Sequence, residues 1–256
     1  MKIVTCGTIK GGVGKTVISA HVAAALADMG RKTLLMDLDP QGHATLLLGV
    51  DLDPEARCVG EALMQGASSK LRGTILREIR PNLAVAPGII RMAMMERQLY
   101  AWGLRVRAVQ KALETLGDEQ PDIVIIDTPP HLGAFTEAAL HAADLTIAPI
   151  PALAGSLQGF GDLQSAWSEL QDGRGGILAA VVNLLDARTT ATNSAVCAAM
   201  EDMKLRVLKT QVPKAEPINQ AALEHSLLFD TLPRHPACEV FRELAQEIWN
   251  IVRRMP

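Results

Sequence analysis

A glycine-rich turn near the amino terminus holds the residue types best suited to chemistry. It lies between the apolar run 3–6 and the helical pattern 17–29, and its residues are Lys10, Gly11, Gly12, Val13, Gly14, Lys15 and Thr16. A turn that joins a buried strand to a helix presents unpaired N–H groups and the positive end of the helix dipole to an anion. Lys15 can then reach the outer phosphates, and the Thr16 hydroxyl can bind Mg²⁺, so the turn predicts a phosphate site.

The start of this turn departs from the common phosphate-loop pattern. That pattern has a glycine five residues before Gly14, where this chain has Ile9. An additional lysine, Lys10, begins the turn instead. This departure narrows the class of phosphate-binding protein to which the chain can belong.

Two acidic residues follow the next apolar run, 33–37. Asp37 and Asp39 are two residues apart and share one side of an extended chain, and Pro40 ends the strand. If this strand lies beside the first, the pair lies near the glycine-rich turn, where a carboxylate can orient an attacking water or hold a hydrated metal. The alternative is a solvated turn at a strand end, which Asp-Pro often forms. The neighbouring phosphate turn favours the functional interpretation.

A third acidic residue ends the apolar run 123–127. Ile123, Val124, Ile125 and Ile126 are followed by Asp127 and then by Thr128-Pro129-Pro130. This order is typical of a Walker B strand, whose aspartate is directed at Mg²⁺, usually through water. An apolar run that ends in aspartate is common by chance, so the interpretation depends on its occurring together with the other two motifs.

Short apolar runs alternate with helical patterns along the chain. The predicted strands are 2–5, 33–37, 83–86, 123–127, 145–149, 178–183 and 207–211, and the predicted helices are 17–29, 105–116, 135–143, 157–170, 192–203 and 238–253. Most of these strands are apolar on both faces, which suits a central parallel sheet covered by helices. The pattern predicts a doubly wound α/β fold with ligands at the carboxyl ends of the strands. The segment from 51 to 94 has no clear pattern.

The composition favours a single domain with a large core. The chain has 256 residues, of which 48% are apolar. Its formal net charge of −3 argues against a general nucleic-acid-binding field, so DNA binding would need a local basic patch. The four cysteines lack metal-ligand or redox spacing and are typical of reduced thiols. The chain shows no signal-peptide pattern and no apolar segment of about 18 residues, so we expect an intracellular protein.

Taken together, the three motifs resemble the ParA/MinD family of ATPases with a deviant Walker A loop, and most of all its ParA branch. The resemblance starts from residues 10–16, 37–42 and 125–130 and extends through 138–140, 142–144, 148–150, 183–189, 212–213 and 241–247. It covers nearly the whole chain and is weakest between about 50 and 110. It implies one ParA-like P-loop ATPase domain over residues 1–256, with ATP and Mg²⁺ as cofactors.

The resemblance also implies roles for the catalytic residues. Lys10 would be the signature lysine, which reaches across a homodimer interface to the partner's nucleotide. Lys15 would hold the outer phosphates and Asp39 would position the hydrolytic water. A lysine supplied by a second subunit would add positive charge where the transition state is most negative, so ATP binding would drive dimerisation and slow hydrolysis would time disassembly.

The remaining site residues are implied in the same way. The metal shell would consist of Thr16, Asp37 and Asp127. The nucleotide would contact the loop from Gly11 to Val17, while Asn183 reads adenine and Pro213 packs on the base. Val17 stands where the family usually repeats a threonine, so one hydroxyl contact to the α-phosphate is missing. His131 stands where serine is frequent, and we interpret it as incidental.

DNA binding is implied by the resemblance to the ParA branch. In that branch the ATP dimer binds nonspecific DNA through basic residues near the C-terminal helices. Residues 204–256 hold eight Lys and Arg against six Asp and Glu. The candidate contacts are Lys214, Arg234, Arg242, Arg253 and Arg254, each of which could equally be solvated surface charge. The resemblance further implies a nucleoid-associated cytoplasmic location and a ParB-like or other cargo adaptor that stimulates hydrolysis.

The main alternative is a MinD-like membrane-associated positioning ATPase. That class needs an amphipathic C-terminal helix able to lie on a lipid surface. Val240, Leu244, Ile248 and Ile251 have helical spacing, but such a stripe usually packs on a protein core, and no flexible linker precedes it. An iron–sulfur role is excluded because no cysteine lies between residues 127 and 144. A small-molecule ligase or reductase would need a substrate motif, and none is recognisable.

Overall fold

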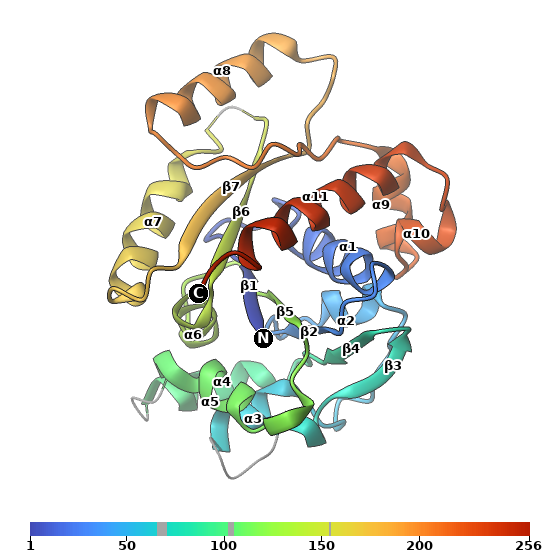
Figure 1. The fold of residues 1–256 in the computed structure, drawn as a ribbon, viewed down its shortest axis with the longest axis vertical. Coiled ribbons are helices and arrows are strands. Elements are labelled where there is room, and N and C mark those ends of the chain that lie inside the picture. Colours follow the sequence, from blue (N-terminus) through green and yellow to red (C-terminus); the bar gives the residue numbers. More distant parts are fainter. Residues whose placement is uncertain (66–70, 102–104, 154) are drawn as a thin grey trace.

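A twisted seven-stranded sheet forms the centre of the computed structural model, which describes residues 1–65, 71–101, 105–153 and 155–256 (Figure 1). The strands are β1 (Lys2–Cys6), β2 (Thr33–Asp37), β3 (Leu76–Arg80), β4 (Leu83–Ala86), β5 (Ile123–Asp127), β6 (Leu145–Pro151) and β7 (Ile177–Asn183). Their order in the sheet is β3-β4-β2-β5-β1-β6-β7. All neighbours pair in parallel except β3 and β4, which form an antiparallel edge. The predicted doubly wound, mostly parallel sheet is confirmed.

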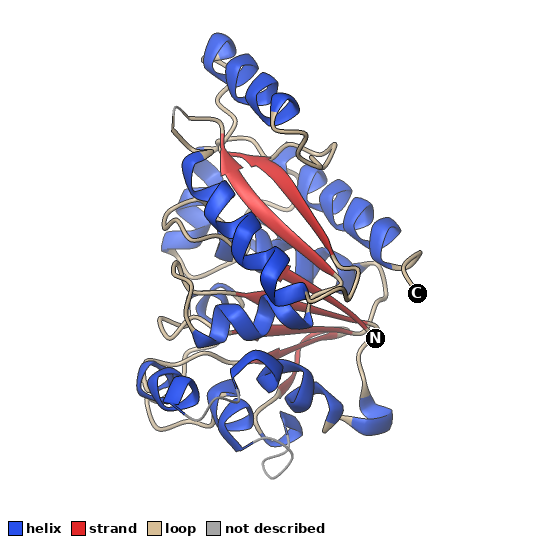
Figure 2. Ribbon diagram, turned by 90° about the vertical axis from the view of Figure 1, so that its left-hand side faces the viewer, coloured by secondary structure: helices blue, strands red, loops and turns tan. Residues whose placement is uncertain are grey.

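Helices cover both faces of this sheet (Figure 2). They are α1 (Lys15–Asp28), α2 (His43–Leu47), α3 (Val59–Gln65), α4 (Met92–Ala101), α5 (Ala108–Glu114), α6 (Ala134–Ala142), α7 (Gln158–Gln171), α8 (Thr190–Asp202), α9 (Glu216–Leu223), α10 (Leu228–Thr231) and α11 (Pro236–Val252). Alternate residues of one strand enter different cores: Ile123 and Ile125 pack with α1 and α11, whereas Val124 and Ile126 pack with α3 to α6. This arrangement explains why the central strands are apolar on both faces.

The prediction of a strand at 207–211 was wrong. Val207 forms only an isolated bridge with Ala180. Beyond it, the carboxylate of Glu247 in α11 accepts the backbone N–H groups of Lys209 and Thr210 at 2.8 and 3.0 Å. Because a side chain already satisfies these donors, the segment follows the edge of the sheet without extending it.

The segment from 51 to 94, which had no clear sequence pattern, contains α3, β3, β4 and the start of α4. The predicted helix at 105–116 is divided into a 3₁₀ turn, Arg105–Arg107, and α5. Near the amino terminus, α1 begins at Lys15, two residues earlier than predicted, so Lys15 and Thr16 belong to its first turn. This placement brings both side chains to the positive end of the helix dipole.

The last helix, α11, has one strongly apolar face that is buried in the protein. Phe241, Leu244 and Ile248 have no exposed surface and pack in the same core as α1. At this contact, the imidazole of His21 in α1 stacks on Phe241 with ring centroids 4.3 Å apart. The predicted docking of this helix on the core is confirmed. Among the residues that the structure describes, no helix has the length and apolarity needed to cross a membrane.

Candidate active site

The three predicted motifs meet at the carboxyl ends of adjacent strands. β5 lies between β1 and β2, and Asp127 at its end is in register with Cys6 on one side and with Asp37 on the other. The glycine-rich turn follows β1 directly, so it lies beside both carboxylates. The carboxyl ends of these strands, where ligands are predicted to bind, therefore hold the phosphate turn and the acidic residues together.

The glycine-rich turn has the backbone form of an anion cradle. Gly12 and Gly14 have φ values of 71° and 86°, in the left-handed region that glycine adopts without a steric penalty. Gly14 is the N-cap of α1, and no side chain caps this helix end. The side chain of Lys15 is buried, with its Nζ 3.4 Å from the Lys10 carbonyl oxygen. Unpaired N–H groups, a helix dipole and a buried amine fit a polyphosphate.

Asp127 is held by two hydroxyl groups of α1. The Thr16 hydroxyl donates to one carboxylate oxygen at 2.8 Å, and the Ser19 hydroxyl lies 2.9 Å from the other. Ser19 was not singled out from the sequence. Its position three residues after Thr16, on the same face of a helix, is the signal that could have identified it.

Asp37 is held by the start of α2. The backbone N–H and the hydroxyl of Thr45 both donate to one carboxylate oxygen at 2.8 Å, and the Asp39 N–H donates to the other at 3.2 Å. The Thr45 hydroxyl in turn accepts the Gly88 N–H at 3.2 Å. Thr45 and Gly88, neither of which the sequence reading identified, therefore orient this carboxylate.

Burial makes ionisation of both inner carboxylates unfavourable in the absence of a bound cation. Asp37 and Asp127 have no exposed surface. Burial, and next the charge of Asp127, raises the pKa of Asp37, and burial likewise raises the pKa of Asp127 to about 6. Among the ion pairs of the described residues, none neutralises either group.

This environment fits Mg²⁺ bound together with a nucleotide. The Thr16 hydroxyl and the carboxylate oxygens are hard ligands of the kind Mg²⁺ prefers. Within the described ranges, no group of three or more His, Cys, Asp or Glu side chains forms a metal cage. Such a partial donor set is usual where phosphates and water complete the coordination of Mg²⁺.

A cavity of about 460 Å³ opens over the glycine-rich turn. Its lining includes Asp39 and Pro130 as well as Asn183 and Pro213, and these residues come from four separate segments of the chain. The Asp39 side chain is 8% exposed, and its carboxylate accepts the Gln41 N–H at 2.9 Å. The structure therefore brings the predicted nucleotide contacts to one cavity, with Asp39 on its wall.

The predicted base-binding residues, Asn183 and Pro213, both line this cavity. The Asn183 side chain is 3% exposed and donates to the Val13 carbonyl oxygen at 2.7 Å. Leu184, which follows it, has a φ of 52°, an unusual value for a residue with a Cβ. Leu185 forms a bridge with Pro213. Asn183 thus braces the phosphate turn from the same position that the resemblance assigns to adenine recognition.

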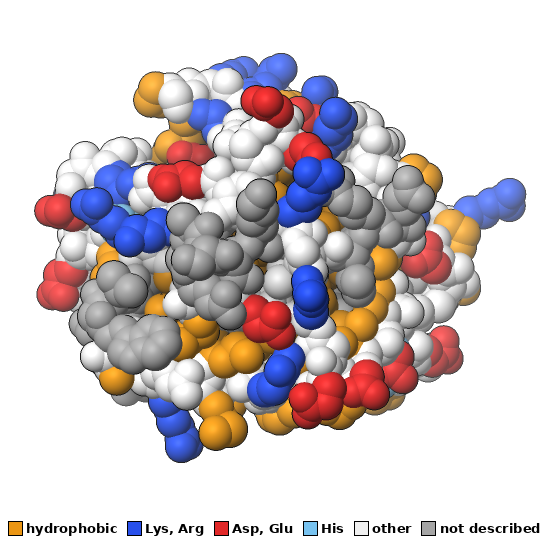
Figure 3. Space-filling model, turned by 90° about the horizontal axis from the view of Figure 1, so that it is seen from below, with side chains coloured by type: hydrophobic (Ala, Val, Ile, Leu, Met, Phe, Trp, Pro, Cys, Tyr) orange, Lys and Arg blue, Asp and Glu red, His pale blue; other side chains and the backbone are white. Residues whose placement is uncertain are grey.

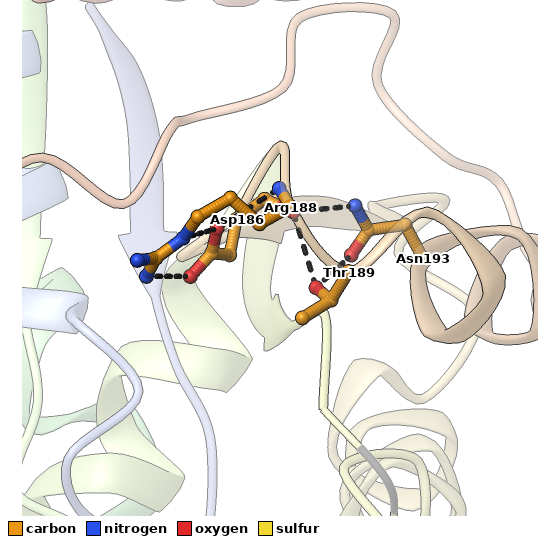
Figure 4. A network of polar contacts seen from close by, with 4 residues as sticks. All are labelled: Asp186, Arg188, Thr189 and Asn193. Carbon is orange, nitrogen blue, oxygen red and sulfur yellow. Dashed lines mark hydrogen bonds and ion pairs between the residues drawn. The ribbon is translucent and has the colours of Figure 1, made fainter.

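A polar network stiffens the loop that follows Leu185 (Figure 4). The Asp186 carboxylate accepts two bonds from the Arg188 guanidinium, at 2.9 and 2.7 Å. Its backbone carbonyl oxygen accepts from the Thr189 hydroxyl and from the Asn193 amide. Hydrogen bonds to Arg188 hold the pKa of Asp186 below its ordinary range. The network connects the segment that follows Asn183 to the start of α8.

Lys10 and Lys15 differ in position although both belong to the phosphate turn. The Lys15 side chain lines the cavity, whereas the exposed Lys10 is absent from its lining. The Lys10 N–H donates to the Thr8 hydroxyl at 3.1 Å, which anchors the backbone and leaves the side chain at the surface. Lys10 is therefore exposed at the surface and does not line the cavity of its own chain.

Two of the candidate DNA-binding residues, Arg242 and Arg254, line one groove beside α11. Lys214 is exposed beside Leu185, near the carboxyl ends of the strands. Arg253 and Arg254 follow the last helix near the amino ends of the strands. There the Lys2 amine, at the start of β1, donates to the Met255 carbonyl oxygen at 2.9 Å.

The other two candidates lie in α11 or just before it. Arg242 forms an ion pair with Glu239 at 3.2 Å and stacks over Phe229. Arg234 is exposed in the turn before α11. On the face that carries α3 and α5, basic and acidic side chains are interspersed (Figure 3).

Comparison with known proteins gives consistent matches. The sequence model of a family described as an AAA domain matches residues 1–177. The chain is 32% identical over 254 residues to the sporulation initiation inhibitor protein Soj of Bacillus subtilis, covering 96% of this chain and 98% of Soj. It is 30% identical over 245 residues to the chromosome-partitioning ATPase Soj of Thermus thermophilus, covering 93% and 92%.

A solved structure gives the same fold. It is cobyrinic acid a,c-diamide synthase from Mycobacterium smegmatis with a bound ATP analogue and magnesium. The TM-score is 0.86 at 28% sequence identity, and the alignment covers all of this chain and 97% of the synthase chain. The nucleotide and magnesium of that protein agree with the ligands that fit the cavity described above.

Proposed function

Because the chain belongs to the ParA family of the ParA/MinD ATPases and uses ATP and Mg²⁺, we propose that it is a dimerising switch that binds nonspecific DNA as the ATP dimer. In this proposal the switch positions or segregates a plasmid, a chromosome or a protein assembly. A ParB-like or other cargo adaptor stimulates its slow hydrolysis. Its location is the cytoplasm, in association with the nucleoid.

The observation that carries the proposal is the contrast between Lys10 and Lys15. Lys15 is buried on the wall of the nucleotide cavity, while Lys10 extends to the surface from the same turn. A second chain that docks over the cavity would bring its own Lys10 amine to the phosphates. Nucleotide binding and dimerisation then become one event, because each site is completed by its partner.

The residues of the chain divide the work of hydrolysis. The backbone N–H groups of the turn and the Lys15 amine bind and orient the phosphates. Thr16, with Asp37 and Asp127 behind it, would hold Mg²⁺, which supplies electrostatic stabilisation of the phosphoryl group when bound. The Asp39 carboxylate on the cavity wall accepts a hydrogen bond from the attacking water and directs it. Lys10 of the partner subunit stabilises charge on the transferred group.

We expect ATP with Mg²⁺ to convert the chain from monomer to dimer and to cause binding of DNA of unrelated sequence. Size-exclusion chromatography with light scattering measures the first change, and retardation of DNA at several salt concentrations measures the second. Affinity should fall steeply with salt, by about 0.9 log units per log unit of salt for each phosphate contacted. Lys214→Ala tests a DNA contact near the carboxyl ends of the strands. The double variant Arg253→Ala and Arg254→Ala tests a contact near the amino ends.

Other outcomes would replace this proposal. Co-sedimentation with vesicles without DNA retardation would favour the MinD-like alternative, although the apolar face of α11 is buried against α1. ATP turnover by a chain that remains monomeric and does not bind DNA would favour a small-molecule ligase.

We expect Lys10→Ala to reduce dimer-dependent hydrolysis by about 10²-fold or more, because a charge directed at the transition state is lost. Binding of ATP to the monomer should change less than twofold, since the side chain does not line the cavity of its own chain. Titration with a fluorescent ATP analogue and turnover measured against protein concentration check the two parts. An equal loss of binding and turnover would show that Lys10 acts within its own subunit.

A further inference from the structure

Helix α4 contacts the segment that follows Asp127. In α4, the Glu96 side chain is 13% exposed, and one carboxylate oxygen accepts the Phe135 N–H at 3.2 Å. The other oxygen lies 3.2 Å from Nε2 of His131. Gly133 allows this approach, because a Cβ there would overlap the Glu96 carboxylate. Glu96 therefore caps the start of α6 from a different helix and holds the turn after Pro130.

The residues just before α4 contact the segment that follows β2. The Gly88 N–H donates to the Thr45 hydroxyl, which donates to Asp37. A Cβ at Gly88 would lie 2.7 Å from the Asp37 carbonyl oxygen and 2.6 Å from that of Asp39. Both are backbone atoms that cannot rotate away, so only glycine allows this packing. The loop that carries Asp39 rests directly on Gly88.

From these contacts we propose that residues 87–101 position the hydrolytic machinery, and that Glu96 is a positioning residue for ATP hydrolysis. The inference rests on the ATPase activity proposed above. One end of the segment supports Asp37 and Asp39, and the other end holds the turn next to Pro130. Two loops that are far apart in sequence are thereby held in one arrangement by a single short element.

The effect of Glu96 should fall on hydrolysis rather than on nucleotide binding. Neither Glu96 nor His131 is part of the cavity lining, whereas Pro130 and Asp39 are. The phosphate turn lies between β1 and α1, and its hydrogen bonds run to Thr8, to Asn183 and within the turn itself. Loss of Glu96 therefore loosens the part of the cavity wall that Pro130 forms, while the hydrogen bonds of the phosphate turn are kept. A misplacement of about 1 Å at such a wall can cost up to about 10²-fold in rate.

We expect Glu96→Ala to lower kcat for ATP about tenfold while the Kd for ATP changes less than twofold. Glu96→Gln keeps an acceptor for the Phe135 N–H and should restore most of the rate. Glu247→Ala is the matched control. Glu247 is also a partly buried carboxylate that accepts backbone N–H groups, those of Lys209 and Thr210 at 2.8 and 3.0 Å, and it lies in α11, outside residues 87–101 and both post-strand segments. This control should keep the kcat of the unaltered chain.

Hydrogen exchange of the nucleotide-free chain tests the contact without relying on turnover. In Glu96→Ala, amides of residues 128–137 should exchange faster, while those of residues 10–16 should not change. Equal kcat values for the Glu96 and Glu247 variants, or unchanged exchange at 128–137, would overturn the positioning role. An unaltered chain without ATP turnover would contradict the proposed function, and the exchange result would still decide whether Glu96 holds this segment.

Discussion

Replacing Asp39 by alanine is expected to slow ATP hydrolysis by about 10²-fold or more and to leave the chain as a persistent ATP-bound dimer. The side chain lies on the wall of the nucleotide cavity, where its carboxylate can orient water, and it is hydrogen-bonded within its own turn, to the Gln41 N–H. Binding of ATP should therefore survive. Single-turnover hydrolysis and light scattering in the presence of Mg-ATP measure the two effects.

The variant Asp39→Asn separates the charge of this residue from its structural role. Asparagine can still accept the Gln41 N–H, so the local turn is kept while the negative charge is lost. We expect Asp39→Asn to be nearly as slow as Asp39→Ala. Unchanged turnover in either variant would show that another group positions the water.

Replacing Asp127 by asparagine is expected to stabilise the nucleotide-free protein while lowering Mg-dependent hydrolysis about 10- to 100-fold. The carboxylate is fully buried, and its pKa is raised to about 6 from an ordinary value of 3.8. The folded state therefore binds more protons than the unfolded state between about pH 4 and 6. Stability is lost as the pH rises through this window, and the loss is complete above it.

Asparagine removes this penalty, so the free energy of unfolding should increase by about 1–3 kcal/mol above pH 6. Its amide can still pair with the hydroxyls of Thr16 and Ser19, which accept as well as donate. Chemical denaturation of the nucleotide-free chain at pH 5 and pH 8 measures the effect, and the gain should be larger at pH 8.

Asp144→Asn is the control for this prediction. Asp144 lies before β6 and is only half-buried. Its carboxylate accepts the Ile3 N–H at 2.8 Å at the amino ends of the strands, away from the active site. Its replacement should give no increase in stability. A gain at Asp144 equal to that at Asp127, or no gain at Asp127, would contradict a stored electrostatic penalty at the active site.

Much of the sheet could be predicted because each central strand is recognisable from its own short stretch of sequence. The strand ending at Asp127 is a short, continuously apolar run, and so are its neighbours ending at Cys6 and Asp37. Burial on both faces selects such runs whatever their surroundings. The edge strands were harder to predict. In β3 only two of the five residues are apolar, and at 207–211 the Glu247 carboxylate accepts the N–H groups of Lys209 and Thr210. Pairing at an edge depends on competing partners that lie elsewhere in the chain.

The sequence by itself determined the chemical groups of the site and their order, because the phosphate turn and the strand-end aspartates are short local patterns. Their meeting at one edge also followed from the sequence, since parallel neighbours end on the same side. Only the tertiary structure decided what supports them. Glu96 and Phe135 are 39 residues apart and Thr45 and Gly88 are 43 apart. Such contacts depend on how α4 packs against the sheet, and no local pattern records that packing.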